Sequence, residues 1–409
     1  MALDMKFVRD QFPALNKGWV FLDNAGGSQI LKGAVEKMNE YLFNNNVQLG
    51  GSYEVSQQAA KAMMQGREAV ATLVNATRPE EIYFASSSTV ALQVLSRAME
   101  SQLQAGDEII ITNSDHESNV GPWVRLADKG VVIKIWKVNP ETYELELDKL
   151  SELMNEKTKL VCVAHVSNLL GTINPVKEIA KLVHDNGARI CVDGVAYAPH
   201  RAVDVADWDV DYYAFSLYKT YGPHFAAMYG KYDLLLELDN LYHYFYDKEK
   251  VPAKLEPGNA SYELSYSITG IVEYLEQLGA QAGCTGTKRE KVVAAYADMT
   301  AQENIIAEML MSYLRGRNDC KIIGLTKGDD PRRVPTISFT IDGKDPDQVC
   351  RKVDIHKVAI RFGDFHARRL AEDLGLMENN GVIRVSMTHY NTVEEIKDLI
   401  KALDLVLSE

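Results

Sequence analysis

The chain has little of what marks several large classes of protein. Its 409 residues contain no apolar run near the roughly 20 residues that span a bilayer, and its first residues lack the charged and apolar regions of a signal peptide. The net charge of -13 argues against a nucleic-acid or anionic-membrane partner, because such partners require a basic face. We therefore expect a protein that binds neither nucleic acid nor membrane.

Cysteine is scarce as well. The five cysteines are scattered and show no metal-ligand spacing, so the sequence predicts no metal site. Two of them, Cys162 and Cys191, lie in apolar runs and are expected to be buried core thiols. The chain also has no internal repeat and no low-complexity linker. These features fit a reducing compartment, and we expect a cytoplasmic protein.

The hydrophobic pattern indicates two domains, and the chain is long enough for both because single cores stop growing near about 250–300 residues. From about residue 30 to 235, helix-like and strand-like segments alternate, which is typical of a doubly wound, mostly parallel α/β sheet. A long helical stretch over 288–317 and further strands indicate a smaller α+β domain. We expect a large domain over 21–265 and a small C-terminal domain over 266–409. The expected strands of the large sheet cover 81–84, 108–112, 131–137, 159–164, 189–192 and 212–215.

Two charged residues follow expected strands of this sheet. Asp193 ends the apolar stretch 188–192, and Lys219 follows the stretch 212–216. A lysine amine can form a Schiff base with the aldehyde of pyridoxal phosphate. A carboxylate can keep the pyridine nitrogen protonated, so that the ring withdraws electrons from the α-carbon of a substrate. Because ligands of open α/β sheets gather at the carboxyl ends of strands, we expect both side chains on one rim.

Several motifs in a fixed order carry a resemblance to a known family. They are Phe21-Leu22-Asp23-Asn24, His165-Val166-Ser167-Asn168, Asp193-Gly194, Lys219-Thr220-Tyr221-Gly222-Pro223 and Tyr390-Asn391-Thr392. With them the chain resembles the class V aminotransferase superfamily of fold-type I pyridoxal-phosphate enzymes, and the cysteine desulfurases most of all. The resemblance covers nearly the whole chain. It implies the cofactor pyridoxal 5'-phosphate, an amino-acid substrate, a homodimer, and an N-terminal segment over 1–20 that joins the small domain.

Hydroxyl groups are expected to hold the cofactor phosphate. Ser88 and Thr89 follow a strand and begin a helix, where free N–H groups suit a phosphate; hydroxyls at this place can also be ordinary helix caps. The resemblance implies the phosphate role for these two residues. It also implies phosphate contacts by Ser216 and by Tyr218, which stands where the desulfurases carry histidine.

The resemblance implies a cofactor role for three further residues. His116, after the strand 108–112, would stack on the pyridine ring and relay protons near the α-carbon. Asn168 would lie near the phenolic oxygen of the cofactor or the substrate carboxylate; the alternative is a turn residue. Asn259 would reach the phosphate of the neighbouring subunit, which would make the active site shared across the dimer.

The carboxylate of an amino-acid substrate requires a cation that binds it with two hydrogen bonds. Arg384 lies within the otherwise apolar strand 382–386, and an arginine among valines and isoleucines is not expected to be buried without an anion. It is the first candidate, with a structural ion pair as the alternative. Arg361 is the second candidate.

The resemblance breaks at two positions. His366 stands in the place of the catalytic cysteine of the desulfurases, and no cysteine follows Cys350. An imidazole cannot carry a persulfide, so the chain resembles a cysteine-desulfurase-like branch that lacks the thiol. Ala196 stands where that branch has histidine and the desulfurases have glutamine, which removes a contact to the cofactor oxygen. Tyr197 or His200 could replace that contact.

These residues lead us to expect a pyridoxal-phosphate-dependent β-elimination, most directly a C–S lyase. Lys219 would act as the base at the α-carbon, Asp193 would hold the ring nitrogen, and His366 would protonate the leaving group or merely fill space. A class V aminotransferase or a racemase is the alternative, because the same carbanion can be reprotonated elsewhere. A non-catalytic scaffold protein and an unrelated enzyme with a phosphorylated substrate are further alternatives, but a scaffold requires neither Lys219 nor Asp193.

Overall fold

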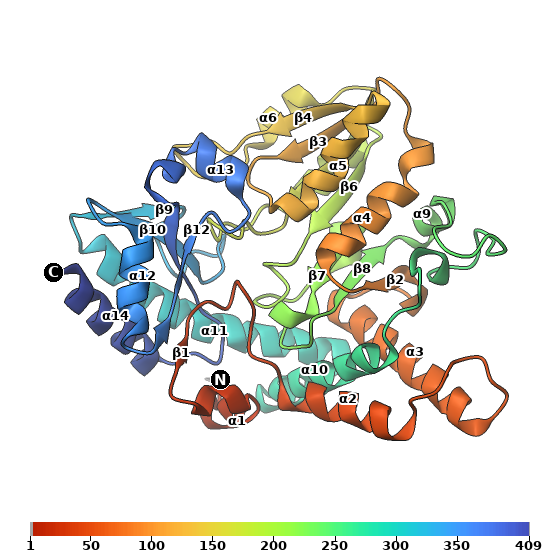
Figure 1. Cartoon of the computed structure of the whole chain (residues 1–409), viewed down its shortest axis with the longest axis horizontal. Coiled ribbons are helices and arrows are strands. Elements are labelled where there is room, and N and C mark those ends of the chain that lie inside the picture. The colour runs from red at the N-terminus through yellow and green to blue at the C-terminus, as the bar shows by residue number, and fades with distance from the viewer. Residues whose placement is uncertain (1–2, 409) are drawn as a thin grey trace.

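A seven-stranded sheet forms the centre of the computed structural model, which describes residues 3–408 (Figure 1). Its strands are β2 (Ile82–Ala85), β3 (Glu108–Thr112), β4 (Val132–Trp136), β5 (Thr158–Ala164), β6 (Arg189–Asp193), β7 (Tyr212–Ser216) and β8 (Ala226–Gly230). They follow the order β2-β8-β7-β6-β5-β3-β4. All neighbours run parallel except β8, which is antiparallel to β2 and β7. The expected mostly parallel α/β sheet is confirmed.

The inner strands are continuous apolar runs because helices cover both faces of the sheet. Cys162 and Cys191 face each other in the register of β5 and β6, and both are buried, as expected. The helices before and around this sheet are α1 (Met5–Asp10), α2 (Lys32–Asn44), α3 (Glu54–Val74), α4 (Ser88–Ala98), α5 (Gly121–Val124), α6 (Leu147–Leu153), α7 (Val176–Asp185), α8 (Val205–Trp208), α9 (Tyr232–Glu237) and α10 (Tyr262–Gln281).

A second, antiparallel sheet follows in the C-terminal part of the chain. It contains β9 (Cys320–Ile323), β10 (Thr336–Ile341), β12 (Arg361–Gly363) and β13 (Val382–Ser386), in the order β12-β13-β10-β9. The apolar run 358–361 is divided between two strands of different sheets. Its first part, β11 (Val358–Ala359), pairs in parallel with β1 (Val20–Phe21) near the N-terminus. The remaining helices are α11 (Lys288–Arg315), α12 (Pro346–Asp354), α13 (Arg368–Asp373) and α14 (Val393–Leu407).

Helix α11 runs beneath both sheets and connects their cores (Figure 1). Val292 and Met299 belong to the core of the large sheet, whereas Ile306 and Leu314 belong to the core of the small sheet. The domain boundaries expected at residues 20 and 265 remain predictions; residue 265 lies within α10. Within residues 3–408, no helix combines the length and the apolar character needed to cross a membrane.

Candidate functional site

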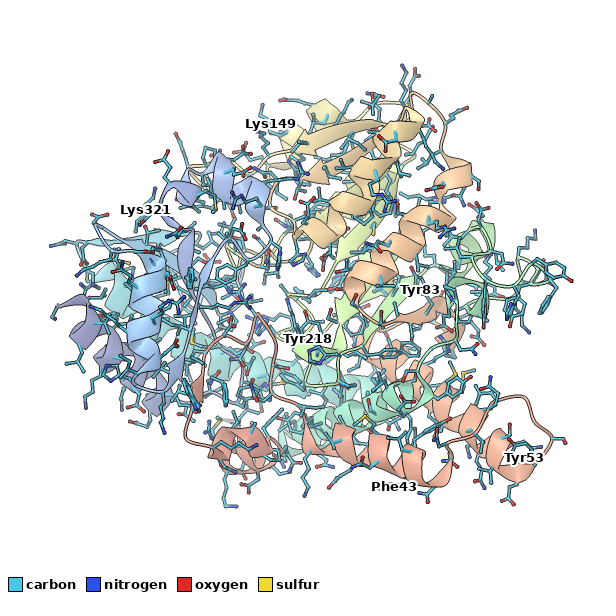
Figure 2. All side chains as sticks on the ribbon, viewed as in Figure 1. Phe43, Tyr53, Tyr83, Lys149, Tyr218 and Lys321 are labelled. Carbon is cyan, nitrogen blue, oxygen red and sulfur yellow. The ribbon has the colours of Figure 1, made fainter. Side chains whose placement is uncertain are left out.

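Lys219 and Asp193 lie in one pocket at the carboxyl ends of β6 and β7, as the sequence predicts. The space inside the pocket, counted together with the solvent at its mouth, is about 500 Å³. Its lining includes Ser88, Thr89, His116, Asn168, Asp193, Ala196, Tyr218 and Lys219. Tyr218 lies beside the end of β7, near the middle of the molecule (Figure 2). Segments far apart in the sequence therefore bring most of the expected cofactor residues to one place.

Burial sets the charge state of the two central residues. It lowers the pKa of Lys219 to about 8, helped by the positive charge of Arg384 and opposed by Asp193 and Asp23. Burial raises the pKa of Asp193, which the backbone N–H of Val195 (2.9 Å) and the charge of Lys219 counteract. A lysine with this pKa is partly unprotonated near neutral pH, as a nucleophile or base requires.

The hydroxyls of the expected phosphate site come from β7 and the start of α4. Ser88 Oγ lies 2.9 Å from Ser216 Oγ, and both side chains are buried. Ser87 is an ordinary helix cap, since its hydroxyl accepts the N–H of Val90 at 3.2 Å. Thr89 is exposed in the first turn of α4 and lines the pocket.

The His116 ring lines the pocket and is neutral. Burial lowers its pKa to about 4, with further contributions from the charges of Lys219, His366 and Arg384. Its Nδ1 accepts the backbone N–H of Ser118 at 3.1 Å, so the proton of the neutral ring is on Nε2. The ring of His366 lies 5.0 Å away between centroids, at an angle of 52°. The structure therefore places the ring-stacking candidate next to the histidine that is expected in the place of the thiol.

Asn168 connects the pocket to the loop that follows β12. Its Nδ2 donates to the carbonyl of Phe365 at 2.8 Å, and its own backbone carbonyl accepts from Arg384 Nη1 at 3.1 Å. Its Oδ1 is buried without a hydrogen-bond partner among the described residues. An orphaned buried acceptor is costly, and it indicates a place where a ligand donates a hydrogen bond.

Arg384 lies next to the pocket on β13 but does not line it. It is 2 % exposed, and its Nη2 donates to Asp23 Oδ1 at 3.0 Å, which is the structural ion pair expected as the alternative to substrate binding. Burial lowers its pKa to about 10. Arg361 is exposed and pairs with the other oxygen of Asp23 at 3.5 Å. Two arginines share one aspartate, which leaves one positive charge for a substrate carboxylate.

Three further expected positions do not contribute to this pocket within one chain. Asn259 lies on an exposed loop before α10, where the hydroxyl of Tyr242 donates to it at 3.5 Å. Tyr197 stacks on His165 at 3.6 Å between centroids, and His200 pairs with Glu303 at 2.9 Å. Both residues are engaged elsewhere, so neither is placed to make the contact that the resemblance leads us to expect near Ala196.

Sequence reasoning missed three residues of the site. Asp23 lies in one of the motifs of the resemblance, but its role depends on Arg384, which is distant in the sequence. Phe365 was not singled out. Asp115 precedes His116 and is buried; burial raises its pKa to about 7, against hydrogen bonds from Thr112 and Asn119. An acid three residues after the end of an apolar strand was the available signal for Asp115.

The residues present fit pyridoxal phosphate. A buried lysine of lowered pKa and a buried carboxylate share one pocket, paired hydroxyls lie at a helix N-terminus, and Asn168 Oδ1 lacks a partner in the part of the chain that the structure describes. Lys219 would hold the aldehyde carbon, Asp193 the ring nitrogen, and Ser88, Thr89 and Ser216 the phosphate.

Comparison with known proteins gives consistent matches over the whole chain. The family described as Aminotransferase class-V matches residues 20–399. Aminotransferase-like protein FGM3 of Gibberella zeae is 40% identical over 408 residues, which is 98% of each chain. Cysteine desulfurase-like protein ustD of Aspergillus flavus is 31% identical over 417 residues, covering 99% of this chain and 91% of that protein. The apo structure of a cysteine desulfurase from Thermococcus onnurineus NA1 has a TM-score of 0.88 at 25% identity, covering 100% of this chain and 99% of the other. The expected type I fold is confirmed.

Proposed function

The chain belongs to the class V aminotransferase family, whose enzymes depend on pyridoxal 5'-phosphate, and from this premise we propose that it is a β-eliminating lyase that cleaves a C–S bond of an amino acid. One observation carries the proposal. His366, not a thiol, lies beside His116, and none of the described residues that line the pocket is a cysteine. Without a thiol, sulfur released from the substrate cannot be held as a persulfide and leaves to solvent.

Arg384 and Asn168 bind the substrate carboxylate in this proposal. The guanidinium of Arg384 offers two parallel N–H donors, which suit a carboxylate. The side-chain amide of Asn168 donates to Phe365, and the backbone carbonyl of Asn168 accepts from Arg384, so the two residues lie together. When bound, pyridoxal phosphate withdraws electrons from the substrate's α-carbon. Asp193 holds a proton on the ring nitrogen of the cofactor; burial raises the pKa of its carboxyl, and the Val195 N–H and the charge of Lys219 favour the carboxylate form that this role requires.

Lys219 and His366 move the protons. Lys219 Nζ takes the proton from the α-carbon, and the Cβ–S bond then breaks with both electrons going to sulfur. The leaving sulfur takes a proton from the His366 ring, which is exposed and lies beside the His116 ring of the pocket. Addition of water gives pyruvate and ammonia, so that L-cysteine and water become pyruvate, ammonia and hydrogen sulfide.

We propose a cytoplasmic homodimer for the assembly. Asn259 is exposed and does not reach the pocket of its own chain, and the neighbouring loop presents exposed Tyr244 and Phe245. Aromatic residues of this kind are common at interfaces. In a dimer, Asn259 would reach the phosphate site of the partner.

Product identification by NMR tests the proposed reaction. Holoenzyme incubated with L-cysteine or L-cystine, without an added thiol, is expected to form pyruvate above a cofactor-only blank. Lys219→Ala is the matched control and should form none. Alanine with sulfur transferred to an acceptor would contradict the proposal, and a racemised or transaminated product would favour the alternative activities of the family.

A further inference from the structure

Phe365 covers the residue proposed to bind the substrate carboxylate. The centroid of its ring lies 3.6 Å from the guanidinium carbon of Arg384. The ring itself is only 7 % exposed. Such a stack is a cation–π contact in a desolvated place, where these contacts are strongest. Asp23 accepts a hydrogen bond at the edge of the Arg384 guanidinium, and the Phe365 ring covers its face. Arg384 is therefore closed off from the pocket.

The backbone of Phe365 binds Asn168, the second residue proposed to hold the substrate carboxylate. Its carbonyl accepts the Asn168 Nδ2 hydrogen bond at 2.8 Å, so it takes the position that a carboxylate oxygen would need. One residue therefore engages both groups, through its ring at Arg384 and through its carbonyl at Asn168.

This closed arrangement has identifiable costs. Phe365 (φ +54°) and His366 (φ +61°) are consecutive non-glycine residues in the left-handed region, which favours glycine. Arg384 Nε is buried without a hydrogen-bond partner among residues 3–408. Strain and an unpaired donor both favour an alternative in which the loop moves and Arg384 receives another acceptor.

We propose that Phe365 is a specificity-determining residue that occupies the carboxylate site until a substrate carboxylate displaces it. The inference rests on the proposed function, in which Arg384 and Asn168 bind that carboxylate. A ligand without a carboxylate cannot replace the carbonyl at Asn168 or pair with Arg384, so it cannot open the loop. The enzyme thus selects amino acids over simple amines before any bond is broken.

Displacement of Phe365 also moves the proposed acid. His366 follows directly in the chain, its carbonyl accepts the N–H of Glu117 at 2.9 Å, and Arg369 pairs with Glu117 at 3.3 Å. A rotation that removes Phe365 from Arg384 changes the backbone that holds His366. Carboxylate recognition is thereby coupled to the placement of the leaving-group acid.

Ligand titration of the holoenzyme tests the inference. The probes are L-alanine, which has a carboxylate but no β-leaving group, and ethylamine, which has neither, and binding is followed by the visible absorbance of the cofactor. Phe365→Ala and Phe365→Leu remove the ring from Arg384 and should bind L-alanine about tenfold more tightly, because binding no longer has to displace the stack. Phe365→Tyr preserves the stack and should match the unaltered protein. Ethylamine binding should be the same in all four proteins.

Two results would overturn the inference. The first is L-alanine binding that is unchanged or weaker in both Phe365→Ala and Phe365→Leu, which would make the ring a support for Arg384. The second is an equal gain for ethylamine, which would mean that the ring only narrows the pocket. The Arg384→Lys variant tests the proposed function separately from the role of Phe365. If this variant binds L-alanine as well as the unaltered protein does, the proposed carboxylate site itself is wrong.

Discussion

Lys219 shows how a single side chain obtains its chemistry from its surroundings. A lysine amine of ordinary pKa is protonated at neutral pH and is a poor nucleophile. Burial and the charge of Arg384 shift the equilibrium toward the neutral amine, while Asp193 limits the shift. The same neighbours that are proposed to bind the substrate and the ring nitrogen therefore also adjust the base.

Capture of the cofactor by apo protein is expected to depend on pH through this amine. Only the unprotonated amine attacks an aldehyde, so the rate should rise with pH through about 8, the pKa of Lys219. Arg384→Gln removes a positive neighbour and should move the midpoint to higher pH. Asp193→Asn removes a negative neighbour and should move it to lower pH. Stopped-flow absorbance after addition of pyridoxal phosphate measures both shifts, and equal midpoints in all three proteins would contradict this account.

The identity of residue 366 is expected to decide where the sulfur goes. His366→Gln cannot protonate the leaving sulfur, so pyruvate formation should slow by about 10²-fold without a new product. His366→Cys places a thiol beside His116, so part of the product from L-cysteine should change from pyruvate to alanine with a persulfide. NMR of the products and a sulfide assay distinguish the two variants. Pyruvate at the full rate in His366→Gln would show that His366 only fills space.

At the scale of elements, runs of apolar residues are the sequence pattern that predicted strands correctly. It located β3, β5, β6 and β7 and the residues at their ends, such as Asp193 and His116. It missed β8, which contains two alanines and a glycine and so has a weak strand propensity. It also missed α10, which is packed between α2, α3 and α11 and has no single polar face.

The contacts of Asp23 and Phe365 could not be predicted from local pattern. Asp23 meets Arg384 across 361 residues of chain, and Phe365 meets Asn168 across 197. Such pairs are created by the packing of the two sheets. Strand-end residues were predictable because their position follows from their own segment, whereas these contacts depend on segments that nothing in the sequence places together.

The crossing of α10 and α2 gives a prediction with an internal control. A Cβ at Gly270 would lie 2.5 Å from the carbonyl carbon of Gly33, which is backbone and cannot move aside. Gly270→Ala should therefore destabilise the protein by about 1–3 kcal/mol, although alanine is the better helix former. A Cβ at Gly33 would meet Gly270 O at 3.6 Å, an ordinary contact, so Gly33→Ala should be neutral or slightly stabilising. Thermal unfolding of the apo proteins checks both, and equal midpoints would contradict the close approach.

At the scale of the whole molecule, the N-terminal segment joins parts that the two sheets keep separate. Phe12 is completely buried, and its ring lies 4.8 Å from Tyr390 and 5.7 Å from both Tyr221 and Tyr274. Tyr390 follows β13, Tyr274 belongs to α10, and Tyr221 follows Lys219 by two residues. One aromatic cluster, which belongs to the core of the large sheet, therefore links the N-terminus, α10, the segment after β13 and the loop of Lys219.

Loss of Phe12 is accordingly expected to affect the whole molecule. Phe12→Ala leaves a cavity at this junction and should lower the free energy of unfolding by about 3–5 kcal/mol. Phe43→Ala is the control, because Phe43 is 84 % exposed at the outer edge of the molecule (Figure 2) and its loss should change stability by less than about 0.5 kcal/mol. Calorimetry of the apo proteins measures both. Since Tyr221 lies so close to Lys219, Phe12→Ala should also slow cofactor capture, and a stability loss that leaves the capture rate unchanged would show that the cluster supports the fold without supporting the site.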